Sequence, residues 1–173
     1  QDSVSYIKEL KKLVKSEKDC DIVACPPFTA ALAVAKQLKG SNLQLGAQNM
    51  HCEDSGAFTG EISPLMLKEV DCQFVLLGHS ERREFFGEDD YLINRKVIAA
   101  LKRSLQPILC IGETLQQRQQ NKTHEALENQ LKGGLKNVDK KQILQLSIAY
   151  EPIWAISRGN PEHKPATKED AEN

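Results

Sequence analysis

The chain has 173 residues, of which 40% are apolar and 27% charged, a composition typical of an ordinary globular protein. Its 23 basic and 24 acidic residues leave a formal charge of −1, which argues against nucleic acid or an anionic membrane surface as the main partner. The longest uninterrupted apolar run spans only residues 30–35, whereas about 20 residues are needed to cross a bilayer.

Short apolar runs alternate with helical patterns along the chain. The chain opens on an amphipathic helical pattern with Val4, Ile7, Leu10 and Val14 on one face. Strand-like runs follow at 20–27, 43–48, 74–78, 107–112 and 144–152. Helical patterns lie at 29–39, from Pro64 after Ser63, and at 80–86, 89–104 and 113–137. This alternation predicts an α/β fold with a parallel sheet, and we expect one domain over residues 1–173.

The cysteines and histidines show no metal-binding pattern. The five cysteines are odd in number and form no CxxC pair, so we expect reduced thiols and a cytoplasmic protein. The four histidines show neither HxxxH nor HxH spacing, so we expect no metal. The chain also contains no GxGxxG and no GxxxxGK[ST] sequence, which gives a dinucleotide or P-loop enzyme no support.

Polar residues follow the strand-like runs, at the edge where a parallel α/β fold gathers its functional groups. His79 follows the run 74–78. If residues 80–86 form a short helix, its first N–H groups would favour the neutral imidazole. Ser80 and Glu84 have the spacing of a capping box at the start of that helix. The plainer explanation of His79 is a histidine that ends a strand for packing reasons.

Glu151 leaves the apolar run 148–150 at the same predicted edge as His79. Partial desolvation there would suit a general base, and Pro152 stiffens the backbone that follows. The alternative is a carboxylate that simply ends a strand. Cys110 offers a third possibility, a thiol nucleophile with His79 as its base. Since Cys110 lies inside the apolar run 107–112, a buried structural cysteine is the favoured interpretation.

Several motifs closely resemble the triosephosphate isomerase family and occur in the family's order. They are "AQN" at 47–49, "GAFTGEIS" at 56–63, "LGHSERREFFGE" at 77–88, "CIGETL" at 110–115 and "AYEPIWAI" at 149–156. The resemblance implies a (β/α)8 TIM barrel, here incomplete, with about five parallel strands that correspond to family strands two to six. It also implies the interconversion of dihydroxyacetone phosphate and D-glyceraldehyde 3-phosphate, a reaction of glycolysis and gluconeogenesis that uses no metal and no cofactor.

The resemblance assigns roles to individual residues. Glu151 is the base that moves a proton between adjacent carbons, and His79 is the neutral electrophile that polarises the carbonyl; in this family a helix amino end keeps that imidazole neutral. Glu81, Ser80 and Cys110 take supporting places around this pair. Arg82 and Arg83 are expected to be structural ion-pair partners.

Two loops also match the family. The stretch from Pro152 to Thr167 resembles a lid that closes over substrate, in which the backbone N–H of Ser157 binds the phosphate. Ser157 stands where the family usually has glycine, so the hinge differs. The loop 49–60, with Thr59 near its end, resembles an arm that reaches into a neighbouring subunit. The resemblance therefore implies a homodimer.

The chain also departs from the family in its extent. The family opens with a strand that carries an asparagine and a substrate-binding lysine, and it closes with two further strands whose loops hold the phosphate. Without them we expect two open sheet edges and a chain that is nearly inactive alone. The alternatives are a non-catalytic barrel remnant that pairs with a partner chain, and a different phosphate-binding barrel.

Overall fold

The computed structural model describes residues 2–156 of the chain, and residue 1 and residues 157–173 lie outside the described part. The predicted phosphate contact at Ser157 therefore also lies outside the described residues. The strands are β1 (Ile22–Ala24), β2 (Leu43–Ala47), β3 (Phe74–Leu77), β4 (Gln106–Ile111) and β5 (Ser147–Tyr150). The helices are α1 (Asp2–Leu13), α2 (Phe28–Leu38), α3 (Pro64–Glu69), α4 (Ser80–Phe85), α5 (Asp90–Lys102), α6 (Leu115–Gln119), α7 (Thr123–Gly134) and α8 (Lys140–Ile143), with a 3₁₀ turn η1 at Ile153–Ala155.

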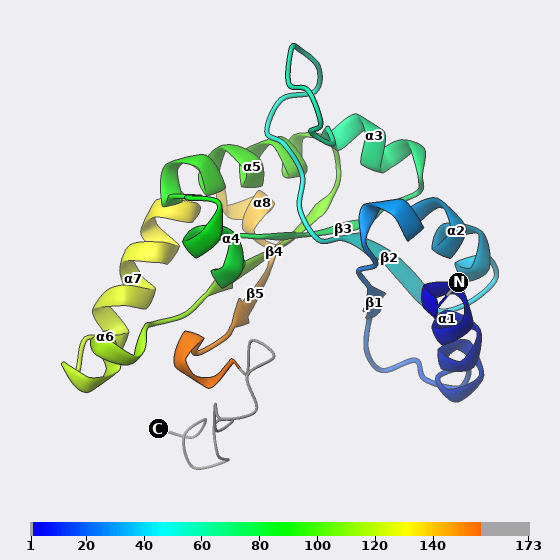
Figure 1. Cartoon of the computed structure of the whole chain (residues 1–173), viewed down its shortest axis with the longest axis horizontal. Coiled ribbons are helices and arrows are strands. Elements are labelled where there is room, and N and C mark those ends of the chain that lie inside the picture. The colour runs from blue at the N-terminus through cyan, green and yellow to red at the C-terminus, as the bar shows by residue number, and fades with distance from the viewer. Residues whose placement is uncertain (1, 157–173) are drawn as a thin grey trace.

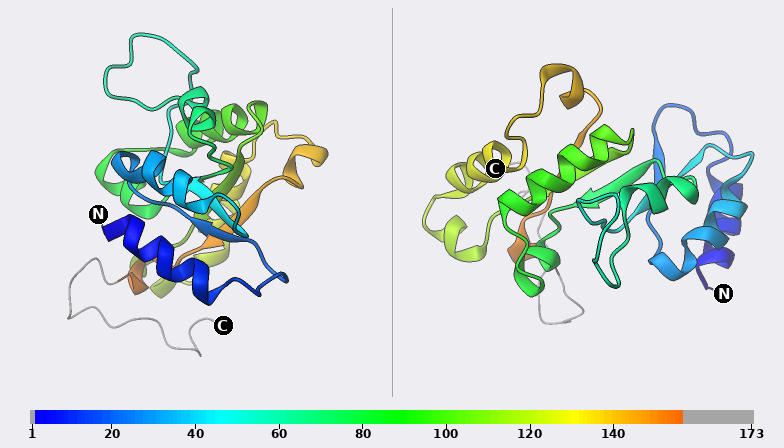
Figure 2. Two further views of the ribbon diagram at one scale, coloured as in Figure 1. Left: turned by 90° about the vertical axis from the view of Figure 1, so that its right-hand side faces the viewer. Right: turned by 90° about the horizontal axis from the view of Figure 1, so that it is seen from above.

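The five strands form one parallel sheet in the order β1-β2-β3-β4-β5. The sheet curls into an arch, and helices cover its outer side (Figure 1). The two turned views in Figure 2 show the same curled sheet from the side and from above. This is the α/β architecture of an incomplete TIM barrel, as the sequence predicts.

The core lies between the sheet and the helices. Val75 and Leu77 of β3 and Leu109 of β4 are fully buried and pack with Ile93 and Val97 of α5. Burial of such side chains is the main stabilising contribution to the fold. The alternate residues of the same strands point to the opposite, concave face of the sheet. The site described below lies at the carboxyl ends of the strands.

The predicted strands and most helices are confirmed, with two corrections in the second half of the chain. The expected single helix over 113–137 is wrong, because α6 and α7 are separate helices. Asn121 lies between them with φ of 56°, a left-handed conformation that an α-helix cannot contain. Thr114 caps α6 through a box with Gln117, which fixes a new helix start inside the predicted one. The short helix α8 was not predicted.

No helix within residues 2–156 has the length and apolar character required to cross a bilayer. In the same part of the chain no cluster of three or more histidine, cysteine, aspartate or glutamate side chains could hold a metal ion.

Candidate active site

His79 stands at the turn between β3 and α4. The strand ends, and Gly78 with φ of +74° bends the chain sharply, which is a conformation that favours glycine. His79 then caps α4: its Nδ1 accepts a hydrogen bond from the backbone N–H of Glu81 at 3.3 Å. The helix therefore starts at Ser80 with His79 as its cap, and the predicted capping box led by Ser80 is wrong.

The capping contact determines which ring nitrogen of a neutral His79 carries the proton. Because Nδ1 accepts a hydrogen bond, the proton of the neutral imidazole lies on Nε2. The His79 Nε2 atom lies 3.3 Å from Oε2 of Glu151. The Glu81 carboxylate is on the other side, 3.8 Å from Nδ1. His79 therefore presents an N–H donor towards Glu151.

Glu151 directly follows β5, and β4 lies between it and the strand that carries His79. Its backbone N–H donates to the carbonyl of Ile111 at 2.9 Å, which extends the β4–β5 pairing by one residue. Its Oε1 accepts the backbone N–H of Ser80 at 3.0 Å. The first N–H groups of a helix favour a carboxylate. The structure thus brings together the two residues that the sequence singled out.

The comparisons with known proteins agree with this geometry. A family model described as triosephosphate isomerase matches residues 1–173. Proteins named triosephosphate isomerase are similar over nearly the whole chain: one from Clostridium botulinum (strain Loch Maree / Type A3) is 52% identical over 99% of this chain and 67% of its own length. Another from Thermoanaerobacter pseudethanolicus is 49% identical over 98% of this chain and 66% of its own length. The chain belongs to the triosephosphate isomerase family. It spans about two thirds of the length of these relatives.

The buried carboxylate of Glu113 ties together the residues on either side of Glu151. Its oxygens accept hydrogen bonds from Tyr150 Oη at 3.0 Å and from Trp154 Nε1 at 2.8 Å. Arg118 lies 3.6 Å from the same carboxylate and covers the Trp154 ring at 4.6 Å from its centroid. Burial and, to a smaller extent, the hydrogen bond to Glu113 raise the pKa of Tyr150. These partners satisfy a charge that is completely buried. In the sequence Glu113 directly follows the strand-like run 107–112, and nothing else there indicates its role.

Cys110 is buried in β4 beneath this site. Burial, with a smaller contribution from the Glu151 carboxylate and against the opposing effect of Arg83, raises the pKa of its thiol to about 12. A thiol in this state stays protonated and is a poor nucleophile. The geometry therefore favours the structural interpretation of Cys110 over a thiol enzyme.

Arg82 and Arg83 are ion-pair partners, as the sequence predicts. Arg83 Nη1 bonds Asp90 at 2.6 Å, and its Nε donates to the Gly78 carbonyl at 2.8 Å, which braces the turn before His79. Arg82 Nε bonds Glu88 Oε1 at 2.6 Å.

A buried lysine extends this arrangement and was missed by sequence reasoning. Lys96 Nζ reaches Glu88 Oε1 at 2.5 Å and Asn49 Oδ1 at 2.8 Å. Its only signal in the sequence was a lysine on the largely apolar inner face of the helix at 89–104.

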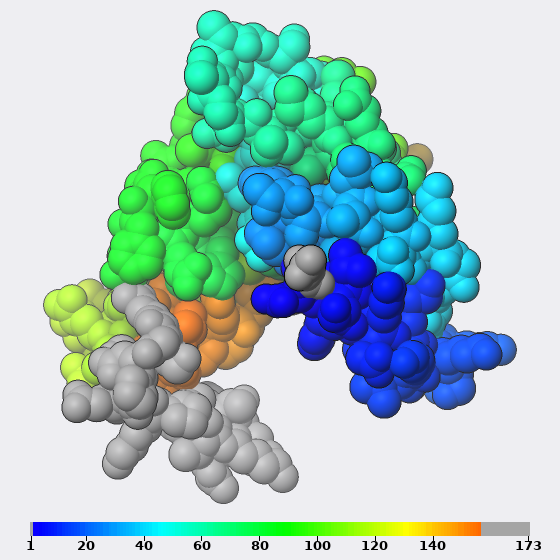
Figure 3. Space-filling model, turned by 45° about the vertical axis from the view of Figure 1, so that its right-hand side comes forward, coloured from blue at the N-terminus to red at the C-terminus, as the bar shows by residue number. Residues whose placement is uncertain are grey.

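A cavity of about 300 Å³ opens beside His79, lined by Gln48, Asn49, Arg82 and the rings of Phe28 and Phe86. The loop 49–60 itself projects away from the helices, as the ribbon and the space-filling view both show (Figure 1, Figure 3).

Thr59 is exposed near the end of the projecting loop. The loop is held to α5 by two ion pairs, Glu53 with Arg95 at 2.5 Å and Asp54 with Arg103. The hydrogen bond from Arg103 lowers the pKa of Asp54. The loop 49–60 therefore forms an arm that two ion pairs hold in place. The open cavity next to His79 lies elsewhere on the same chain.

Proposed function

We propose that this chain supplies the acid–base pair of a triosephosphate isomerase, which interconverts dihydroxyacetone phosphate and D-glyceraldehyde 3-phosphate through an enediolate. The observation that supports it best is the proximity of the pair: His79 Nε2 lies 3.3 Å from the Glu151 carboxylate, at the carboxyl ends of β3 and β5. An enediolate reaction needs a base for the C–H proton and a hydrogen-bond donor for the carbonyl oxygen. Glu151 and His79 provide these two groups.

In this mechanism Glu151 takes the proton from one carbon and returns it to the next. His79 donates its Nε2–H to the substrate carbonyl oxygen and stabilises the charge that develops there. It then takes up the proton of the neighbouring hydroxyl oxygen, so that carbonyl and hydroxyl exchange places while the ring regains its proton. The capping bond at Nδ1 holds the ring in the required tautomer.

The contact between the two groups must open when a substrate binds. A triose has to lie between the carboxylate and the imidazole, so Glu151 must give up its bond with the Ser80 N–H. Since Glu113 holds Tyr150 and Trp154 on either side of Glu151, movement of the residues after β5 is coupled to the position of the base. We keep Ser157 as a proposed phosphate contact in the lid.

Substitution of Glu151 in the intact protein tests the proposal. Glu151→Gln should lower kcat by about 10² to 10⁴-fold, because it removes the base and keeps the size of the side chain. Glu151→Asp should lower kcat by about 10²-fold, because it withdraws the carboxylate by roughly 1 Å or more. Turnover is followed by NMR in D₂O, where the unsubstituted protein should introduce deuterium at the carbon that receives the proton.

Glu125→Gln on the exposed side of α7 is the matched control and should leave turnover unchanged. Full turnover by Glu151→Gln would contradict the assignment. An intact protein that turns over neither triose phosphate would favour the alternative, a non-catalytic barrel remnant. The reactive pair and the family membership speak against that alternative.

We also propose a homodimer. Its support is the projecting loop 49–60 with Thr59 exposed, together with the open cavity beside His79, whose rim carries the exposed rings of Phe28 and Phe86. Exposed aromatic side chains around a concavity are typical of protein interfaces. The arm of one subunit would then enter the cavity of the other. The free thiols of all five cysteines support a cytoplasmic location.

A further inference from the structure

Gln130 of α7 forms a paired contact with the backbone of one residue. Its Oε1 accepts the N–H of Gly112 at 2.9 Å, and its Nε2 donates to the Gly112 carbonyl at 2.8 Å. A side-chain amide is the neutral group that can serve one donor and one acceptor on the same residue in this way. Gly112 is buried just beyond the end of β4, where the strand pairing no longer satisfies its main-chain groups. Gln130 replaces that pairing.

Gly112 in turn lies directly against the backbone of Glu151. A Cβ atom at position 112 would be 1.8 Å from the Glu151 carbonyl oxygen and 2.9 Å from its carbonyl carbon, so no side chain fits there. A shift of Gly112 therefore moves, or loses contact with, the main chain that carries the proposed base.

The next residue, Glu113, extends this support. Its carboxylate binds Tyr150 and Trp154, and its carbonyl accepts the N–H of Ile153 at 3.1 Å. Residues before and after Glu151 are thus attached to the backbone segment 112–113. In the described contacts, Gln130 is the side chain that ties the first residue of that segment to α7.

We propose that Gln130 is a positioning residue for Glu151, acting through the backbone of Gly112 and the carboxylate of Glu113. Its effect on catalysis rests on the proposed isomerase function, whereas its effect on the backbone at 112–113 does not. Gln130 touches no reacting atom. Its contribution is to hold the base where proton transfer is fast.

The first test is Gln130→Met in the intact protein, which keeps the length of the side chain and removes both hydrogen bonds. We expect kcat to fall about 10 to 100-fold, because a base displaced by roughly 1 Å loses that much rate. KM should change by less than about two-fold, since substrate contacts are retained. Gln119→Met, the same change at an exposed position of α6, is the control and should match the unsubstituted protein.

A second variant, Gln130→Glu, separates positioning from a loss of packing. Its protonated carboxyl group donates to the Gly112 carbonyl and accepts from the N–H, as glutamine does, whereas its ionised form faces the carbonyl with a second acceptor. Relative to the unsubstituted protein, the activity of Gln130→Glu should therefore rise as pH falls. The activity of Gln130→Met relative to the unsubstituted protein should not change with pH. A second cavity, of about 570 Å³, is lined by Gln130 and Gly112. Arg83 and Glu84 are the charged residues that line it, and both are unchanged in the two variants.

Hydrogen exchange of the Gly112 and Glu113 amides, read by mass spectrometry of the peptide that contains them, is independent of activity. We expect faster exchange in Gln130→Met and near-normal exchange in Gln119→Met. Unchanged exchange and unchanged kcat in Gln130→Met would overturn the proposal. If the unsubstituted protein lacks isomerase activity, the exchange result still decides whether Gln130 positions this segment. If Gln130→Met does not fold, the pH-dependent ratio of Gln130→Glu decides: a flat ratio overturns the proposal.

Discussion

At the scale of single residues, the His79 ring caps a helix and, in the proposed function, also acts on the substrate. Its Nδ1 caps α4, and the same contact places the remaining proton on Nε2, the atom that faces Glu151. The local sequence explains this, because Gly78 allows the sharp turn that puts a side chain at the helix start. Under the proposed function, the helix cap and the reactivity of His79 therefore depend on the same hydrogen bond.

Comparison of His79→Asn with His79→Ala separates the two tasks. Both variants lose the Nε2–H donor, so both should lose about 10² to 10⁴-fold in kcat. Asparagine still accepts from the Glu81 N–H, whereas alanine cannot, so only His79→Ala should lose about 1 kcal/mol of unfolding free energy. Urea unfolding and turnover of the intact protein measure the two effects. Equal destabilisation of both variants would show that the cap contributes nothing.

At the scale of elements, the alternation of strand-like runs and helical patterns predicted five strands in a parallel sheet. It did not predict the break between α6 and α7, because Asn121 adopts its left-handed conformation within an otherwise helical polar stretch. The pairing of His79 with Glu151 could be expected because strand ends meet at one edge. The contact of Gln130 with Gly112 could not, since it joins two elements through one side chain and leaves no periodic trace.

The projecting arm carries a prediction of its own. Thr59→Arg adds bulk and positive charge at the exposed end of the loop 49–60. In the proposed dimer this loop would no longer fit the partner's cavity of about 300 Å³, which is lined by Arg82. We expect the dissociation constant of the dimer to rise by about 100-fold, as for a central interface residue. Sedimentation velocity over a range of concentrations measures it. Thr123→Arg on α7 is the control, and equal dimerisation of both variants would exclude the arm as the interface.

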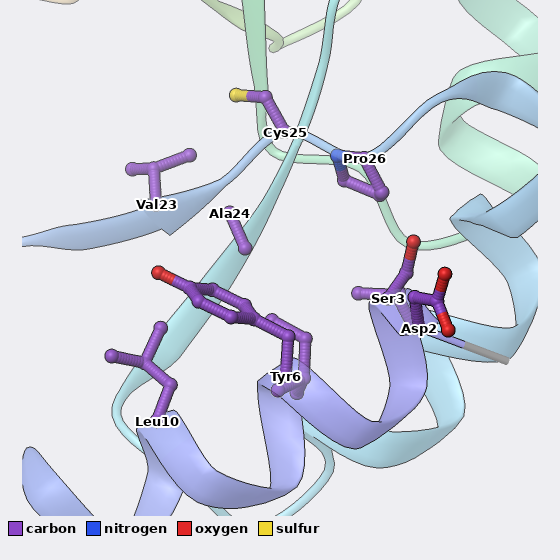
Figure 4. A pocket seen from close by; sticks show the side chains of 10 residues that line it. Asp2, Ser3, Tyr6, Leu10, Val23, Ala24, Cys25 and Pro26 are labelled. Atoms are coloured by element: carbon purple, nitrogen blue, oxygen red, sulfur yellow. The ribbon is translucent and has the colours of Figure 1, made fainter.

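At the scale of the whole molecule, the sheet is an arch whose two edge strands are β1 and β5. Within residues 2–156 each of them pairs with one neighbouring strand only. Ile148 and Tyr150 of β5 are 44% and 47% exposed, in contrast to the buried centre of the sheet. Beside β1, a cavity of about 480 Å³ is lined by Tyr6 and Leu10 of α1 together with Val23 and Cys25 (Figure 4). Unpaired strand edges next to apolar surface favour association with another chain.

A polypeptide made only of residues 1–173 should therefore self-associate and turn over triose phosphate at less than about 1% of the rate of a full-length relative, because each missing donor to the developing charge costs about 10² to 10³-fold. Light scattering and the NMR assay measure the two quantities. A monomer with turnover close to that of the relative would show that five strands are enough for the reaction.

The bond between Trp154 and Glu113 has a practical consequence. Trp154 is the single tryptophan of the 173 residues, and its indole contacts a buried anion and a guanidinium plane. Any rearrangement that follows binding of a triose phosphate would change the polarity around this indole. Its emission wavelength then becomes an optical signal for events next to Glu151, the proposed base, without any label attached to the protein.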